Sequence, residues 1–211
     1  VGLTKRILLS NAFAGMADNI FRWSMIGTER MAVPVMLAWL GSISYSLQIY
    51  YDFSAYSDMA IGLGLCFGFK FPENFNYPYI AESISDFWKR WHISLTDWFR
   101  EYVYFPLGGS RVKNQDFMVR NMLVVWLLTG IWHGANWTFI FWGLMYFVFQ
   151  LAERFFEYPK KMKSKFVKHF YTLMVVNALW VVFRADNLYQ AGRFFMNMLG
   201  VNHNGFYSDL A

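Results

Sequence analysis

The chain has 211 residues, of which 56% are hydrophobic, 22% aromatic and 16% charged. This composition is too apolar for a soluble domain of its size and predicts a membrane protein in contact with lipid. The 19 Lys and Arg residues outnumber the 14 Asp and Glu residues and gather between apolar stretches, so we do not expect nucleic acid as a partner. Cys66 is the only cysteine and no His/Cys spacing resembles a zinc site, so we expect neither an internal disulfide nor a bound metal.

The sequence begins at Val1 without a methionine, and it lacks the charged and apolar regions of a signal peptide. We therefore interpret residues 1–211 as a single membrane-embedded domain that is a fragment of a longer chain. Its helices are expected to pack against others that this sequence does not contain.

Residues 31–51 carry no charge and predict a membrane-spanning helix, because a helix of this length extends about 31 Å. Residues 59–69 are apolar but too short to cross, and their glycines favour a re-entrant or buried segment. The polar segment Gln48–Asp58 is expected to join the two. Its carboxylates Asp52 and Asp58 could line a passage, bond a helix end or orient a histidine, or Asp58 could cap the next helix.

Residues 83–102 follow a proline-containing loop and have the spacing of an amphipathic helix that lies in the membrane interface. One face of this helix is aromatic and aliphatic, and the opposite face carries the charged residues. His92 lies near the edge of the aromatic face. One interpretation is a structural histidine that bonds to a carbonyl or a lipid headgroup, and the other is a functional residue. The spacing alone does not decide between the two.

The uncharged stretch Asn121–Ala152 is 32 residues long and predicts a broken hairpin. Basic residues outnumber acidic ones between residues 111 and 120 before it and in the segment Glu153–Lys168 after it, which places both ends in the cytoplasm. We place the break at His133–Asn136. The first arm, Asn121–Trp132, would be about 18 Å long and would leave His133 inside the protein at membrane depth.

The segment Gly130–Gly134 is also a small-xxx-small pattern, which could simply let two helices approach closely. We favour a polar site, because packing alone needs neither His133 nor Asn136 and neither side chain is stable when buried without a partner. Residues 170–183 predict a further span if its flanking residues extend to the interface, and His169 and His203 are expected to be bystanders.

Four motifs in order resemble the membrane-bound O-acyltransferase family: DFSAYSD at 52–58, DFWKRWHISL at 86–95, YFPLGG at 104–109 and WHG at 132–134. The match is closest to the bacterial alginate O-acetyltransferase branch and runs from about residue 30 to Asp186. The PLGG segment favours this branch over the related enzymes that D-alanylate teichoic acids. The resemblance implies an all-α, polytopic bundle of transmembrane, re-entrant and interfacial helices, of which the N-terminal helices are missing.

The resemblance also implies roles for the two histidines. His133 corresponds to the catalytic histidine of the family and His92 to the second histidine position. A neutral imidazole is suited to take a proton from a sugar hydroxyl at neutral pH, so we expect His133 to be the general base. His92 would orient the donor or stabilise the developing oxyanion, while Asp52, Asp58 and Asn136 would be supporting residues.

The expected function is transfer of an acyl group, most simply acetyl, to hydroxyls of an extracytoplasmic polysaccharide by a multi-pass protein of the bacterial plasma membrane. No bound cofactor is expected; an acyl thioester, acetyl-CoA or an acyl carrier, would be the co-substrate from the cytoplasm. Accessory extracytoplasmic acetylation proteins are expected partners. The alternatives are D-alanyl transfer to teichoic acid, a transporter or flippase component whose substrate route is lined by Asp52 and Asp58, and a helical membrane anchor for a partner complex.

Overall fold

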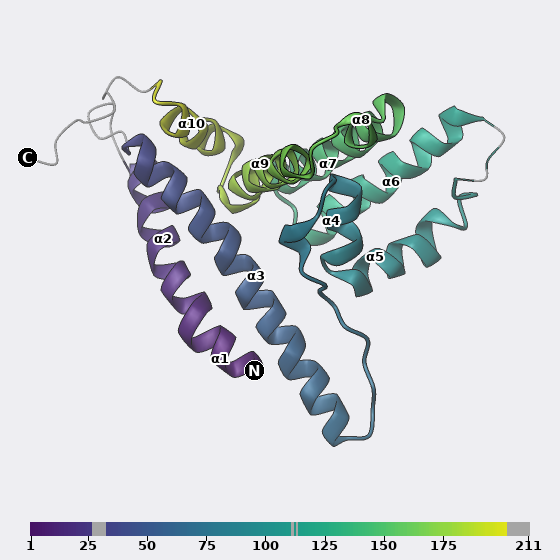
Figure 1. Ribbon diagram of the computed structural model, residues 1–211, viewed down its shortest axis with the longest axis horizontal. Coiled ribbons are helices and arrows are strands. Elements are labelled where there is room, and N and C mark those ends of the chain that lie inside the picture. Colours follow the sequence, from purple (N-terminus) through teal and green to yellow (C-terminus); the bar gives the residue numbers. More distant parts are fainter. Residues whose placement is uncertain (27–32, 111, 113, 202–211) are drawn as a thin grey trace, which may run out of the picture. The chain divides into compact units, whose positions relative to one another are not determined.

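A computed structural model describes residues 1–26, 33–110, 112 and 114–201, and the regular structure in these residues is helical (Figure 1). The all-α prediction is therefore confirmed for the described residues. The chain forms two compact units: one contains residues 1–70 together with the segment that begins at Trp180, and the other contains Phe71–Leu179. The assignment of all 211 residues to a single domain stays a prediction.

The first unit is built on two long helical rods. Helices α1 (Gly2–Thr4), η1 (Lys5–Ser10) and α2 (Asn11–Ile26) follow one another and pack along α3 (Val35–Cys66), and α10 (Leu188–Leu199) packs on both (Figure 1). The core contact is a stack of Phe21 on Phe194, with ring centroids 4.1 Å apart. Gly41 permits a close approach, because a Cβ there would lie 2.6 Å from Ile20.

Helix α3 corrects three predictions at once. The expected joining segment Gln48–Asp58 and the expected short segment 59–69 are, as far as Cys66, parts of one continuous helix of 32 residues. Within this helix Asp58 pairs with Lys5 Nζ at 2.9 Å and Asp52 pairs with Arg6, so both carboxylates have a cationic partner on the neighbouring rod. The alternative in which Asp58 caps a following helix is therefore wrong.

The second unit contains His92, His133 and His169. Its elements are η2 (Pro78–Ile80), α4 (Ile84–Arg90), α5 (Ile93–Phe99), η3 (Arg100–Tyr104), α6 (Gln115–His133), α7 (Trp137–Phe156) and α8 (Tyr158–Lys161). Helix α9 (Lys165–Arg184) begins in this unit and continues into the first. The expected single helix over 83–102 is wrong, because the chain turns at Trp91 and His92, where His92 has a φ of 47° and α5 begins in a new direction.

Helices α6 and α7 form the predicted hairpin, broken between His133 and Trp137. Their backbones meet at two glycines: a Cβ on Gly143 would lie 2.5 Å from the Trp126 carbonyl oxygen, and one on Gly130 would lie 2.7 Å from that of Phe139. The packing interpretation of Gly130 is therefore correct as well. Gly134 has another role, since its φ of 149° ends α6.

The first arm of the hairpin is longer than predicted. Asn114 Oδ1 accepts a hydrogen bond from the Asp116 backbone N–H at 3.0 Å and starts α6 at Gln115. The resulting 19-residue helix is about 28 Å long. The length of α6 therefore does not by itself place His133 within the membrane. The expectation that His133 lies at membrane depth stays a prediction.

Within the described residues, α7 and α9 are the helices that are long and apolar enough to cross a membrane. Helix α9 contains the predicted span 170–183. Residues 35–51 of the predicted span 31–51 belong to α3, which is rich in serine and tyrosine and is not one of these two helices. Residues 31 and 32 lie outside the described residues. Helix α7 extends to Phe156, so the loop that was expected over Glu153–Lys168 begins only after that residue.

The glycine contact predicts a specific sensitivity of the hairpin. Gly143→Ala places a methyl group against the Trp126 carbonyl, and overpacking of this kind costs about 1–3 kcal/mol. We expect a lower melting temperature of the full-length protein in detergent. Gly62→Ala is the control, because no atom lies within 4 Å of its added Cβ; equal melting temperatures for the two variants would contradict the close contact.

Candidate functional site

His133 is held at the break of the hairpin by the residues that follow it. It is the last residue of α6, and Gly134 N–H donates to the Ile131 carbonyl at 3.1 Å to close the helix end. Asn136 then starts α7, since its Oδ1 accepts a hydrogen bond from Thr138 N–H at 3.2 Å. Asn136, predicted as a supporting residue, thus acts as a helix cap that directs the chain away from His133.

His92 is held by a different element, the turn between α4 and α5. Its left-handed backbone conformation is uncommon for a residue with a side chain and directs the imidazole away from the path of α4. The imidazole Nδ1 lies 3.3 Å from Asn74 Oδ1, and Asn74 also accepts hydrogen bonds from Ser94 N–H at 3.1 Å and Ser94 Oγ at 2.9 Å. Asn74 was placed in a loop by the sequence and was not predicted as a site residue.

The contacts of Asn74 bear on which nitrogen of His92 carries the proton. Because the Ser94 backbone N–H is a donor, Asn74 presents its carbonyl oxygen to this cluster. The Nδ1 of His92 lies 3.3 Å from that oxygen and 3.4 Å from Ser94 Oγ, an arrangement that fits a proton on Nδ1 with Nε2 as the acceptor of the neutral ring. Burial, together with the nearby His133, lowers the pKa of His92 from 6.5 to about 4, so the ring is neutral at pH 7.

The two histidines, which come from different parts of the sequence, lie in one site. Both are next to the Trp132 ring, whose centroid is 6.0 Å from that of His92 and 4.9 Å from that of His133. Both imidazoles are partly buried, while Trp132 is 58% exposed. The structure therefore brings together both residues that the sequence singled out, beside an exposed tryptophan.

A cluster of buried rings supports this pair. The fully buried Trp142 meets the His133 ring edge-on at 5.1 Å. Trp88 of α4 packs in turn against Trp126, Trp142 and Tyr146, with centroids 5.0 to 5.7 Å away. These edge-on contacts connect α4 to both arms of the hairpin and place the His92 turn near the hairpin break.

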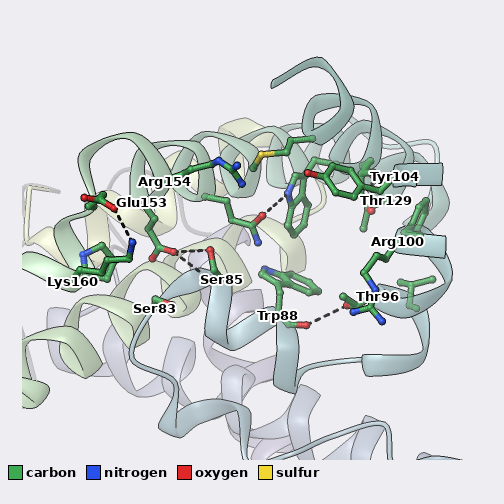
Figure 2. A pocket seen from close by; sticks show the side chains of 18 residues that line it. Ser83, Ser85, Trp88, Thr96, Arg100, Tyr104, Thr129, Glu153, Arg154 and Lys160 are labelled. Atoms are coloured by element: carbon green, nitrogen blue, oxygen red, sulfur yellow. Dashed lines mark hydrogen bonds and ion pairs between the residues drawn. The ribbon is translucent and has the colours of Figure 1, made fainter. Parts of the chain in front are cut away.

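A cavity of about 780 Å³ is lined by residues of α4, α5, η3, α6 and α7 (Figure 2). Trp88 and Trp126 belong to its wall, but neither histidine does. Figure 2 shows Glu153, Arg154 and Lys160 on one side of the view and Arg100 and Tyr104 on the other. Arg100 pairs with Asp97 at 2.8 Å and Lys160 with Glu157 at 2.7 Å, so the end of the cavity that holds Arg154 and Lys160 also holds two carboxylates, those of Glu153 and Glu157.

The PLGG segment follows η3, which borders this cavity, and is fastened by a residue that sequence reasoning missed. Asn121 is fully buried, and its Nδ2 donates to the carbonyl oxygens of Leu107 at 2.9 Å and Gly109 at 3.2 Å. Arg120 donates to Asn121 Oδ1 at 3.0 Å and orients the amide. The sequence signal that could have identified Asn121 is its position at the start of an apolar stretch, because an amide buried there needs hydrogen-bond partners.

The remaining predicted site residues lie elsewhere. Asp52 and Asp58 belong to the first unit, where their partners are Arg6 and Lys5, whereas both histidines belong to the second. The Nδ1 of His169 lies 3.2 Å from the Ala81 carbonyl oxygen, which gives it a structural partner. His203 lies outside the described residues.

Comparison with known proteins agrees with these motifs. The chain is 44% identical over 200 residues to a probable alginate O-acetylase of Azotobacter vinelandii, an alignment that covers 93% of this chain and 38% of that protein. It is 41% identical over 206 residues to a peptidoglycan O-acetyltransferase of Helicobacter pylori, covering 96% of this chain and 38% of the relative. A teichoic acid D-alanyltransferase of Bacillus subtilis is 38% identical over 126 residues, covering 56% of this chain and 32% of the relative.

The chain thus spans about two fifths of the length of the two acetylating relatives. Residues 1–189 match the membrane-bound O-acyltransferase family along nearly the whole of the described chain. The match contains the Trp132–His133 pair, the His92 turn and the helices that hold them. This chain belongs to the membrane-bound O-acyltransferase family.

Proposed function

We propose that the protein is a multi-pass membrane O-acyltransferase that transfers an acetyl group from a cytoplasmic thioester donor to hydroxyls of an extracytoplasmic polysaccharide. The observation that carries this proposal is the meeting of His92 and His133 around the exposed Trp132 ring. Family membership and the two acetylating relatives support acyl transfer as the reaction. The bacterial plasma membrane is the proposed location.

His133 is the proposed general base. Its imidazole takes the proton from the acceptor hydroxyl while the hydroxyl oxygen attacks the thioester carbonyl carbon. The tetrahedral oxyanion then collapses, the carbon–sulfur bond breaks, and the protonated His133 returns the proton to the leaving thiolate. A histidine at the end of a helix that is closed by Gly134 has a fixed backbone position, which such proton transfers require.

His92 is the proposed orienting residue of the pair. In the tautomer that fits the Asn74 contact the proton is on Nδ1, so Nε2 is an acceptor and has no hydrogen to donate to an oxyanion. Of the two roles that the sequence left open, orientation fits this tautomer better than oxyanion stabilisation. The group that Nε2 would hold is the hydroxyl of the acceptor or the protonated ring of His133.

The cavity is the proposed entrance for the donor. Its volume of about 780 Å³ is within the usual size of small-molecule sites, about 300–1,000 Å³. Arg154 and Lys160 at one side suit the phosphate groups of coenzyme A or of a carrier-bound pantetheine. The thioester end would reach His133 past the cluster of Trp88, Trp126 and Trp142. Lipid surrounds the protein in this proposal, and accessory extracytoplasmic proteins present the polysaccharide.

D-alanyl transfer to teichoic acid is the second candidate, supported by the similarity to the Bacillus subtilis enzyme over 56% of this chain. A transporter that uses Asp52 and Asp58 has less support, since both carboxylates are already paired with Lys5 and Arg6. An anchor role would leave the paired histidines without a purpose. Purified full-length protein incubated with acetyl-CoA or D-alanyl carrier and with each acceptor polymer separates these candidates. Acyl transfer identifies the donor, and movement of unmodified polymer across vesicles would identify a transporter.

Removal of the proposed base has a defined consequence. His133→Ala in the full-length protein should lower polymer O-acetylation by about 10²- to 10⁴-fold, the usual contribution of a general base. The measurement is acetyl content of the polymer by mass spectrometry at equal membrane abundance. His169→Gln is the matched control, since that histidine contacts a backbone carbonyl in the same unit. Unchanged acetylation in the His133 variant would remove it from the mechanism.

Glutamine distinguishes the roles of the two histidines, because it forms hydrogen bonds but cannot accept a proton at neutral pH. We expect His92→Gln to retain a measurable part of the transfer rate and His133→Gln to lose it. Rates measured from pH 6 to 8 should show the same profile in wild type and His92→Gln, because the pKa of His92, near 4, lies below this range. Equal losses in both glutamine variants would contradict an orienting role for His92.

A further inference from the structure

Glu153 is a buried carboxylate whose contacts are unusual for a residue near the end of a helix. It is 7% exposed on the last turns of α7. Its Oε1 accepts a hydrogen bond from Ile84 N–H at 2.7 Å, and its Oε2 accepts from Ser85 N–H and Ser85 Oγ, both at 3.0 Å (Figure 2). All three donors belong to the first turn of α4.

We propose that Glu153 is a positioning residue that fixes His92 against His133 by fastening the start of α4 to α7. The inference rests on the proposed acyl transfer at the two histidines. It assigns Glu153 no contact with the reacting atoms.

The first step of the argument is the specificity of the contact. The first N–H groups of a helix have no acceptor within the helix. In α4 the Asp86 N–H is bonded by Ser83 Oγ at 2.9 Å, while those of Ile84 and Ser85 depend on the two oxygens of Glu153. Hydrogen bonds to a charged acceptor are stronger than neutral ones, and a buried carboxylate without them would be strongly destabilising. The position of α4 along α7 is therefore determined at this end.

The second step is the path from Glu153 to the histidines. Helix α4 has seven residues and runs alongside α7, with Ile84 beside Glu153 and Trp88 against Tyr146 and Trp142. The turn that follows α4 carries His92 to Trp132, next to His133. Glu153 thus contacts the start of α4, the Trp88 ring packs along its length, and His92 follows its end. A shift of α4 along α7 moves His92 by a similar distance.

The third step separates this role from two others. Glu153 also belongs to the cavity wall, so it could bind the donor, or it could stabilise the fold without any effect on His92. A donor contact changes the KM for the donor, whereas misplacement of His92 lowers kcat. A purely structural residue lowers the rate equally whether or not His92 is present, because its effect does not pass through that ring.

The experiment is a double-mutant cycle in the full-length protein with acetyl-CoA and polymer. Glu153→Gln presents an NH₂ donor toward one of the α4 donors and is expected to lower kcat by about 10- to 100-fold with little change in the donor KM. In the His92→Ala background the same substitution is expected to cause no further loss. Glu101→Gln is the matched control, since Glu101 is an exposed carboxylate of the same unit that lies outside the cavity wall and outside the contacts of α4 with Glu153.

Ser85→Ala is the milder second variant, because it removes one of the three hydrogen bonds and leaves the carboxylate in place. It is expected to show a smaller loss of kcat that also disappears without His92, and it keeps the test valid if Glu153→Gln does not accumulate. An equal loss in both backgrounds, or a changed donor KM with an unchanged kcat, would overturn the proposal. Retained acetylation in His133→Ala would instead overturn the proposed function itself.

Discussion

The close approach of α6 and α7 at Gly130 and Gly143 is the constraint on which the second unit depends. With no side chain at either position, the two backbones come near enough for rings farther along both helices to interlock. Trp126 from α6 and Trp142 and Tyr146 from α7 then form one cluster, into which α4 inserts Trp88. His133 lies at the end of this hairpin, so its position follows from the same packing.

Hydrogen bonds of polar side chains add to this packing. Each is satisfied by a partner from a distant segment: Asn121 holds the PLGG segment, Asn74 holds His92, and Glu153 holds the start of α4. Buried polar groups are destabilising when unpaired, so each of these contacts favours a single arrangement of its segment. The histidine pair is thereby surrounded by rigid supports while Trp132 stays exposed beside it.

Several elements could be predicted from local pattern. The break at His133–Asn136 was visible because glycine and asparagine follow a long apolar stretch, and such residues end and begin helices. Other elements could not be predicted. The 83–102 segment has an uninterrupted helical period, yet it turns at His92, because the hydrogen bonds from Ser94 and Ile93 to Asn74 favour a new helix there. Likewise the polar segment around Asp52 and Asp58 is helical, and its carboxylates pair with cations that are distant in the sequence.

By itself, the amino-acid sequence determined the helical and apolar character of this protein, its family motifs and the identity of the two histidines. These properties depend on composition and local spacing, which are encoded residue by residue. Only the tertiary structure decided that His92 and His133 both lie next to Trp132, that Asn74 contacts the His92 ring, and that Glu153 belongs to a helix and accepts hydrogen bonds from the start of α4. Those contacts join residues far apart in the chain, and their energy arises only when packing removes both partners from water.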